Sequence, residues 1–285
     1  MRIGWLSTGR DPAARDLLAE TVQRAKRDGV ALDIGAVFCD REPGESEESD
    51  LFLALARDLN IKTVTLSSAH SWHEWWTVDT TPGHGEGAHK HDVREAWRDS
   101  FHYVVGEMLA PLELDLLVLA GYMLVISPDM CEHYAMINLH PALPGGPTGT
   151  WQQVIWELLR SDAHETGVMS HLVTSELDRG PVISYCSFPI VGREFDPLWM
   201  QFRRKRERRG MGAISIDEGE GEPLFAEIRR RGAAREIPLL YQTVRQFADD
   251  CLQIRHRDVE AVIGDLPLDL TAEVEADLAR GAKQA

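Results

Sequence analysis

Cysteine is scarce in this chain, and its few cysteines form no metal-binding or disulfide pattern. Cys39, Cys131, Cys186 and Cys251 lie far apart, and no two of them form a CxxC pair. Zinc knuckles and small disulfide-stapled domains place their cysteines much closer together. We therefore expect free, buried thiols and neither a disulfide framework nor a cysteine-based zinc site.

Long apolar runs are missing as well. No stretch approaches the ~18 consecutive apolar residues that a membrane-spanning helix needs. Hydrophobic residues still make up 44% of the 285 residues, which is enough for a sizeable core. The first ten residues, MRIGWLSTGR, lack the apolar core and cleavage signal of a secretory peptide. The sequence predicts a cytoplasmic protein with no membrane partner.

Basic residues are few relative to acids. The 46 Asp and Glu against 30 Lys and Arg give a formal net charge of −16. Such a field repels a long phosphate backbone. The basic cluster at 202–210 contains Glu207 and is followed by the acidic run DEGEGE at 217–222. This pattern favours a helix face paired with the acidic run over an RNA site, so no nucleic-acid partner is expected.

Strand and helix patterns alternate through the first half of the chain. The expected strands cover residues 2–7, 31–39, 61–67, 115–123 and 136–140, and the expected helices 12–28, 49–60, 93–109 and 128–133. The five consecutive apolar residues within 115–123 indicate a strand that is buried on both faces. The alternation predicts an α/β fold, with an open, mostly parallel, Rossmann-like sheet and helices on both faces.

The second half begins with a Pro/Gly-rich loop at 141–149 and a helix over 151–161. Two further strands, GVMSHLVTSE and PVISYCSFPI, flank the turn at 177–180 and predict a hairpin. Helical sequence follows over 224–254, and the acidic, Ala-rich residues 258–285 are interpreted as a helical or frayed tail.

Asn138 and His140 are the polar residues at the end of the strand expected over 136–140. Ligands bind at this edge of an open α/β sheet, and alternation along a strand puts both side chains on one face. Asp178 lies in the turn of the expected hairpin, and His171 lies in the strand before it. An amide and an imidazolium can stabilise an oxyanion while a carboxylate passes protons, which suits acyl transfer without a covalent nucleophile. By residue type alone, a structural role for a histidine at a strand end is also open.

Two longer motifs include these residues, INLHPALPGG at 137–146 and GVMSHLVTSELDRGPVI at 167–183. Both resemble the formyltransferase family that uses 10-formyltetrahydrofolate. Other matching segments are DVREAW at 92–97, LVLAGYM at 117–123, SPDMCEHY at 127–134 and REIPLLYQTVRQFADD at 235–250. The chain is most similar to members that formylate glycinamide ribonucleotide. The resemblance implies one catalytic domain over 1–257 with inserts near 68–92 and 194–222, followed by a tail over 258–285.

The resemblance also implies roles for individual residues. Asn138 would contact the formyl oxygen, His140 would act as acid and electrostatic stabiliser, and Asp178 would assist proton transfer through water. The implied folate contacts are Arg94, Met123, Leu124, Val125, Ile126, Asn138, Ser175, Glu176, Leu177 and Asp178. Glu236 would hold ribose hydroxyls beside Gly121, and Gly9 and Arg10 would lie in the turn that meets the amine substrate.

The turn after the first strand departs from the family pattern. Members specific for the ribonucleotide carry G-x-G-S-N there, whereas this chain reads STGRDPA over 7–13. Pro12 removes one backbone N–H from the helix start, which weakens phosphate binding. Arg10 could restore charge and Thr8 a hydroxyl, or the turn could merely connect strand to helix. Leu124 stands where the family usually has an arginine at a folate position.

The alternatives therefore concern the acceptor. Formyl transfer to glycinamide ribonucleotide is the first hypothesis, and transfer to an amino sugar or another small amine is the second. A formyltetrahydrofolate deformylase and a folate-binding relative without activity remain open, whereas the acidic C-terminus argues against a tRNA acceptor. His84, His89 and His91 fit no standard metal spacing, so we expect no metal. The segment 68–92 is interpreted as a lid or an oligomer contact, which leaves a homodimer open.

Overall fold

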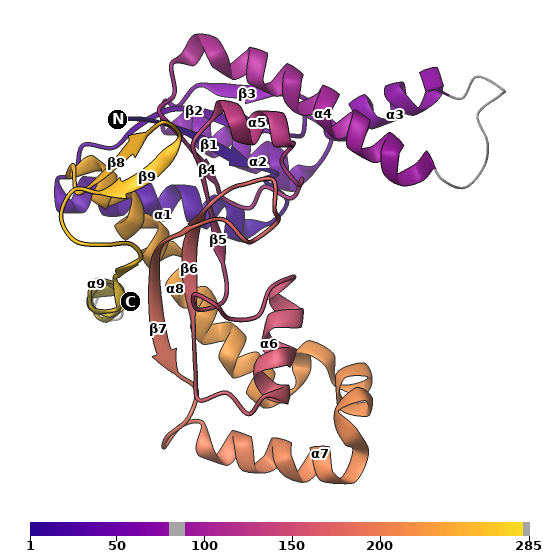
Figure 1. Cartoon of the computed structure of the whole chain (residues 1–285), viewed down its shortest axis with the longest axis vertical. Coiled ribbons are helices and arrows are strands. Elements are labelled where there is room, and N and C mark those ends of the chain that lie inside the picture. The colour runs from indigo at the N-terminus through magenta and orange to yellow at the C-terminus, as the bar shows by residue number, and fades with distance from the viewer. Residues whose placement is uncertain (80–88, 282–285) are drawn as a thin grey trace. The chain divides into compact units, whose positions relative to one another are not determined.

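The computed structural model describes the backbone of residues 1–79 and 89–281, and side chains over 1–74 and 93–281 (Figure 1). The chain divides into two compact units, which we describe separately. The first unit comprises residues 1–138, 172–181 and 245–264, and the second comprises 139–171, 182–244 and 265–285. The boundary between the units falls within the strand that ends at His140, directly after Asn138.

The first unit is built on a parallel sheet with the strand order β5-β4-β1-β2-β3. The strands are β1 (Arg2–Ser7), β2 (Asp33–Cys39), β3 (Thr63–Thr65), β4 (Leu116–Leu119) and β5 (Met136–His140). The helices are α1 (Pro12–Asp28), α2 (Glu47–Asp58), α3 (Ser68–Asp79), α4 (His89–Leu109) and α5 (Pro128–His133), with the short η1 (Ala110–Leu112). β8 (Leu252–Arg255) and β9 (Asp258–Ala261) form a separate antiparallel pair. The predicted alternation of strands and helices is confirmed over residues 2–140, whereas 252–254, predicted as helical, belong to the strand β8.

The middle strands of this sheet are almost entirely buried. Trp5 of β1 is 1% exposed, and all four residues of β4 are buried. β4 is shorter than the strand predicted over 115–123, because the chain turns at Gly121, whose φ is +72°. A positive φ suits glycine and ends the extended conformation there.

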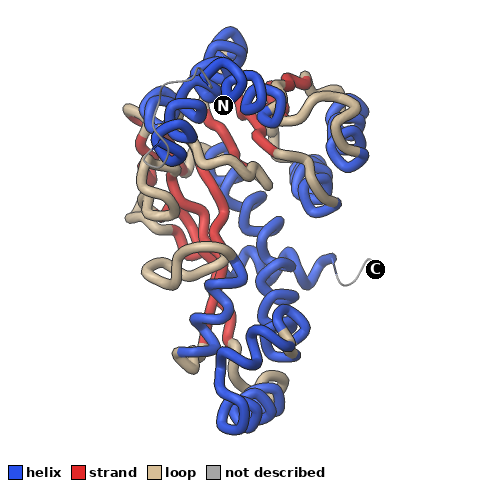
Figure 2. Tube along the Cα trace, turned by 90° about the vertical axis from the view of Figure 1, so that its right-hand side faces the viewer, coloured by secondary structure: helices blue, strands red, loops and turns tan. Residues whose placement is uncertain are grey.

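The second unit contains an antiparallel hairpin with a short parallel strand at its edge, in the order β10-β7-β6. Figure 2 draws the strands in red and the helices in blue. The strands are β6 (Glu165–Leu172), β7 (Val182–Pro189) and β10 (Leu268–Asp269). The helices are α6 (Trp151–Arg160), α7 (Asp196–Asp217), α8 (Pro223–Ala248) and α9 (Thr271–Gly281), with η2 (Gly219–Gly221). The predicted hairpin is confirmed, with Val168 opposite Cys186. Together with the first unit this gives the expected mostly parallel α/β architecture.

The basic cluster on α7 is paired with the acidic run that follows it. Lys205 Nζ lies 2.5 Å from Glu218 Oε2 and 3.2 Å from Glu222 Oε1. Arg209 Nη1 lies 2.9 Å from the other oxygen of Glu218. Arg206 instead reaches Asp162, at 2.9 Å. The predicted pairing of this helix face with the acidic run is confirmed.

The segment predicted as a tail is ordered over most of its length. The helical interpretation is confirmed over 271–281, which form α9, whereas the strands β9 and β10 within 258–269 were not predicted. β10 pairs with β7 in parallel, and α9 buries Val274 completely. The segment is mostly acidic and Ala-rich, but its few apolar residues have the spacing that lets one face of a helix pack against a core.

None of the described helices combines the length and the apolar character that a membrane span requires.

Glu227 of α8 makes the stability of the second unit dependent on pH. Arg230 donates two hydrogen bonds to its carboxylate, both of 2.8 Å, and Arg231 Nε donates one of 2.7 Å. These bonds lower the pKa of Glu227 to about 2. Because that lies below the ordinary glutamate value near ~4.3, the stabilisation is complete above about pH 5 and is lost as the pH falls toward 2.

We therefore expect Glu227→Gln to lower Tm at pH 7 and to differ progressively less from the wild type as the pH falls to about 2.5. Thermal unfolding followed by circular dichroism at several pH values measures this convergence. Glu132→Gln, at an exposed position of α5, controls for the loss of one negative charge. A Tm difference that is constant from pH 7 to pH 2.5 would contradict the assignment.

Candidate functional site

β5 carries Asn138 and His140, two residues apart and therefore on the same face of the strand. Asn138 is half-buried and pairs in register with Leu119 of β4, whereas His140 is 3% exposed. The carbonyl oxygen of Pro147 lies 3.0 Å from His140 Nε2. Since a carbonyl only accepts, Nε2 carries the proton and Nδ1 is the basic nitrogen of the neutral ring.

The Pro/Gly-rich loop after β5 thus has a role that the sequence did not show, because it returns the carbonyl of Pro147 to the imidazole of His140. The turn passes through Gly145, whose φ is +74°. His171 of β6 lies beside His140, with ring centroids 6.4 Å apart, and is 2% exposed. His140 is therefore held by its own loop and packed against a second imidazole in the second unit.

Asp178 lies in the first unit, in the loop 172–181 that the hairpin strands flank. Its φ is +55°, in the left-handed region that aspartate tolerates better than most residues. Val173 N–H donates to the carbonyl of Met136 at 2.8 Å, so the loop is anchored to the strand that carries Asn138. Leu172 N–H also donates to the carbonyl of Pro181 at 2.9 Å, which closes the loop.

The loop also holds the other residues predicted to contact folate from this turn. Ser175 and Glu176 are exposed, and Leu177 is 61% exposed. Thr174 Oγ1 donates to the carbonyl of Glu176 at 3.2 Å, which stabilises the turn before Asp178. The loop therefore presents an apolar side chain and backbone groups to an incoming molecule.

The segment Met123–Ile126 follows β4 in the first unit. Met123 and Val125 are 48% and 42% exposed, whereas Ile126 is 6% exposed. Leu124 packs against the buried core of this unit, where an arginine could not be buried without a partner. The segment therefore combines an exposed apolar surface with an anchored side, as a flat ring system requires. Arg94 is exposed on α4 and stays a predicted folate contact.

The turn after β1 brings Gly9 and Gly121 into the same part of the first unit. Thr8 N–H donates to the carbonyl of Gly121 at 3.0 Å, and Gly9 has a φ of +59°. Asp11 caps α1 by accepting from Ala14 N–H at 3.1 Å.

Arg10 is committed to this turn as well, because its Nε lies 3.4 Å from Asp11 Oδ2. A carboxylate thus already occupies the start of α1, where an anionic ligand would otherwise be favoured.

Glu236 lies in the second unit, on α8. Its Oε1 lies 2.5 Å from Arg229 Nη1, and the Arg229 guanidinium lies over the Trp151 ring at 4.6 Å from its centroid. Glu236 is therefore held by a cation, and its contact with ribose hydroxyls stays a prediction.

The second unit also contains a cavity of about 700 Å³. Pro147, whose carbonyl meets His140, forms part of its wall. Its other lining residues are Thr148, Gln153, Trp156, Glu157, Arg160, Met211, Gly212 and Ser215. The volume is in the range of small-molecule sites, so this unit offers space for a polar ligand next to the His140 loop.

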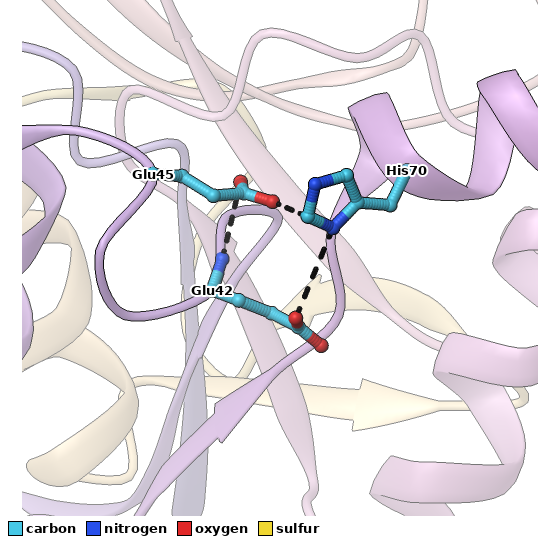
Figure 3. Close-up of side chains that lie close together, drawn as sticks. All are labelled: Glu42, Glu45 and His70. Atoms are coloured by element: carbon cyan, nitrogen blue, oxygen red, sulfur yellow. Dashed lines mark hydrogen bonds and ion pairs between the residues drawn. The ribbon is translucent and has the colours of Figure 1, made fainter.

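Among the residues whose side chains are described, one group could hold a metal ion: Glu42, Glu45 and His70 (Figure 3). His70 Nδ1 lies 3.2 Å from Glu45 Oε1 and 4.0 Å from Glu42 Oε2. Glu42 N–H donates to Glu45 Oε2 at 3.2 Å. The arrangement brings one imidazole and two carboxylates together at the start of α3 and in the loop before α2. His84, His89 and His91 lie outside the residues whose side chains are described.

Two contacts of the segment that follows β4 were not predicted from the sequence, which considered Thr8 only as a source of a hydroxyl for the substrate and did not single out His102. Met123 N–H donates to Thr8 Oγ1 at 3.0 Å, and Ser127 N–H donates to His102 Nδ1 at 3.2 Å. The position of Thr8 directly after the first strand is a signal that could have identified it. No comparable signal marks His102, which lies within a long helix.

Comparisons with known proteins agree with this description. Residues 87–209 match the family model described as formyl transferase. The phosphoribosylglycinamide formyltransferase of Escherichia coli K12 is 39% identical over 106 residues, which is 35% of this chain and 45% of that protein. The chain thus matches less than half the length of this curated relative. The resemblance to the formyltransferase family is confirmed over the matched segment, which contains Asn138, His140 and Asp178.

Solved structures show the same fold. Phosphoribosylglycinamide formyltransferase from Coxiella burnetii has a TM-score of 0.61 at 20% identity, covering 94% of this chain and 98% of that one. A formyltetrahydrofolate deformylase from Pseudomonas syringae has a TM-score of 0.55 at 18% identity, covering 91% and 65%. At these identities the likeness confirms the predicted open α/β fold.

Proposed function

We propose that this protein transfers the formyl group of 10-formyltetrahydrofolate to a primary amine, with glycinamide ribonucleotide as the first acceptor to test. The observation that carries the proposal is the family match over 87–209, which includes the whole trio Asn138, His140 and Asp178. The E. coli relative supports this acceptor by its name. A cytoplasmic location and a homodimer stay predictions.

The proposed reaction is an attack of the amine nitrogen on the formyl carbon. The new C–N bond gives a tetrahedral centre whose oxygen gains negative charge, and the attacking nitrogen must lose a proton. The bond to the folate nitrogen then breaks, and that nitrogen receives a proton. In this scheme Asn138 and the protonated ring of His140 stabilise the oxyanion, while Asp178 passes protons through water.

The folate would lie against residues of the first unit. Met123 and Val125 offer exposed apolar surface to a pterin ring, and the loop 172–181 offers backbone donors and acceptors. Asn138 and Asp178 belong to the same unit as these segments, which supports a common role.

Two alternatives have an observation in their favour. The carboxylate of Asp11 at the start of α1 disfavours a phosphate at that turn, which supports an amino sugar or another small amine as acceptor. The deformylase that shares the fold supports hydrolysis of 10-formyltetrahydrofolate by water. A folate-binding relative without activity has less support, because binding alone does not need the complete trio.

A turnover assay separates these functions. The purified protein is given 10-formyltetrahydrofolate with glycinamide ribonucleotide, with its dephosphorylated riboside, with a panel of amino sugars, or with no amine, and tetrahydrofolate release is followed by absorbance. We expect release that depends on an amine. Tetrahydrofolate release that is equally fast without any amine would identify a deformylase. No release under any condition would contradict the proposal that the protein is an enzyme.

A further inference from the structure

Thr8 lies at the point where the sheet of the first unit changes its winding direction. β1 lies between β2 and β4, so the chain leaves β1 on one side and returns to its other side through β4. The loops after β1 and β4 diverge there, and ligands of open α/β sheets bind in the crevice between such loops. Thr8 directly follows β1, and Gly121 and Met123 lie in the loop after β4.

Thr8 joins the loops after β1 and β4 through hydrogen bonds of its backbone and its side chain. Its N–H donates to the carbonyl of Gly121 at 3.0 Å, and its Oγ1 accepts from Met123 N–H at 3.0 Å. The residue is 3% exposed, so neither bond competes with bulk water. Removing one partner of such a buried hydrogen bond destabilises the protein, because the other partner stays buried without a bond to replace its lost hydration.

Asp40, which follows β2, lies beside the side chain of Thr8. The Thr8 side chain is close enough to the Asp40 carboxyl to lower its pKa, and Ser68 Oγ donates to Asp40 Oδ2 at 3.0 Å. Asp40 is 3% exposed, and burial raises its pKa while these two side chains favour the ionised form. A hydroxyl can accept with its lone pairs while its single proton faces a neighbouring carboxylate, so the position of Asp40 is compatible with the bond from Met123 N–H to Thr8 Oγ1.

His102 holds the other end of the same segment. Its Nδ1 accepts from Ser127 N–H at 3.2 Å, and its Nε2 lies 3.1 Å from Tyr122 Oη. His102 is 1% exposed, and burial lowers its pKa to about 4, so Nδ1 remains an acceptor at neutral pH. The segment between the two anchors keeps Met123 and Val125 exposed.

We infer that Thr8 is a positioning residue for the folate site, since its hydroxyl fixes the segment Met123–Ile126 and couples it to the turn that carries Gly9 and Arg10. The inference rests on the proposed function. It also accounts for the difference from the family pattern at this turn. Where the family has the glycine-rich G-x-G-S-N, this chain has a threonine whose side chain contacts the segment Met123–Ile126.

The test compares Thr8→Val with Thr8→Ser. Valine keeps the branched shape and the backbone bond to Gly121 but leaves Met123 N–H without its acceptor, whereas serine retains the hydroxyl. We expect Thr8→Val to raise KM for 10-formyltetrahydrofolate about tenfold while kcat changes less than about threefold, and Thr8→Ser to stay within about threefold of the wild type in both. Thr21→Val is the matched control, because Thr21 is buried on α1 and its hydroxyl has no hydrogen-bond partner among the residues that the structure describes.

A second measurement needs no activity. Hydrogen exchange of the ligand-free protein should show faster exchange over 121–127 in Thr8→Val than in the wild type, Thr8→Ser or Thr21→Val. Unchanged KM and unchanged exchange in a folded Thr8→Val protein would overturn the inference. If valine prevents folding, Asp40→Asn is expected to show the same faster exchange. Failure of the proposed function looks different: the wild type itself would neither turn over nor bind 10-formyltetrahydrofolate, while the exchange result would still test the role of Thr8.

Discussion

Replacing His140 by alanine is expected to lower kcat by at least ~100-fold, which is typical for the loss of a general acid or an oxyanion donor. The ring is 3% exposed and its Nε2 is fixed by the carbonyl of Pro147 at 3.0 Å. The orientation of the imidazole is therefore set before substrate binds. A water molecule that fills the space in the alanine variant would not be held in the same position. KM for the folate should change much less, because the segment Met123–Ile126 is unaffected.

The measurement is steady-state turnover of 10-formyltetrahydrofolate with the acceptor that the wild type uses. His133→Ala is the matched control, since His133 is an exposed histidine on α5 that contacts the backbone of Asp129. Circular dichroism establishes that both variants are folded. A His140→Ala protein that is folded and retains a near-wild-type rate would refute the role assigned to His140.

Gly180→Ala, in the loop 172–181, is expected to cause a large loss of stability. A Cβ at this position would lie 1.7 Å from the carbonyl oxygen of Leu172, and backbone atoms cannot move aside as a flexible side chain can. The bond from Leu172 N–H to the carbonyl of Pro181 would be lost or distorted as the loop opens. We expect a cost of about 2 kcal/mol or more, together with reduced activity, because Asp178 lies two residues away.

Chemical and thermal unfolding of the variant measure this cost, which corresponds to a decrease in Tm of roughly 5 °C or more. Gly232→Ala provides the control, because a Cβ at this position of α8 would have no heavy atom within 4 Å. Alanine in a helix interior should stabilise the protein by about 0.5–1 kcal/mol. Equal Tm values for the two variants would show that the close approach at Gly180 is not rigid.

The parts of the fold that the sequence predicts well are those governed by local patterns. Continuous apolar runs identified β1 and β4, and the helical spacing of Leu17, Leu18, Val22 and Ala25 identified α1. Leu17, Leu18 and Ala25 lie on its buried face, whereas Val22 is only half-buried. The turn around Asp178 separated two strands that do pair as a hairpin. These sequence patterns predict the elements correctly because each pattern depends only on residues a few positions apart.

The contacts that position the candidate site could not be predicted in this way. Thr8 binds the backbone of Met123, 115 residues later, and His102 binds the backbone of Ser127. A backbone N–H carries no sequence signature, so its side-chain acceptor cannot be identified from either partner. The pairing of Glu236 with Arg229 was missed for a different reason, because charged residues are common on exposed helices and most make no specific contact.

β10 and α9 cover the β7 edge of the sheet in the second unit. β10 supplies hydrogen-bonding partners to β7, and Leu270 N–H adds a bond to the carbonyl of Tyr185 at 2.9 Å. α9 packs Val274 against Leu239 and Cys186. A chain cut at residue 257 would therefore expose unpaired backbone groups along β7 next to an uncovered apolar surface. Such an edge is a template for strand addition from another molecule, so we expect a chain cut at this residue to self-associate more readily.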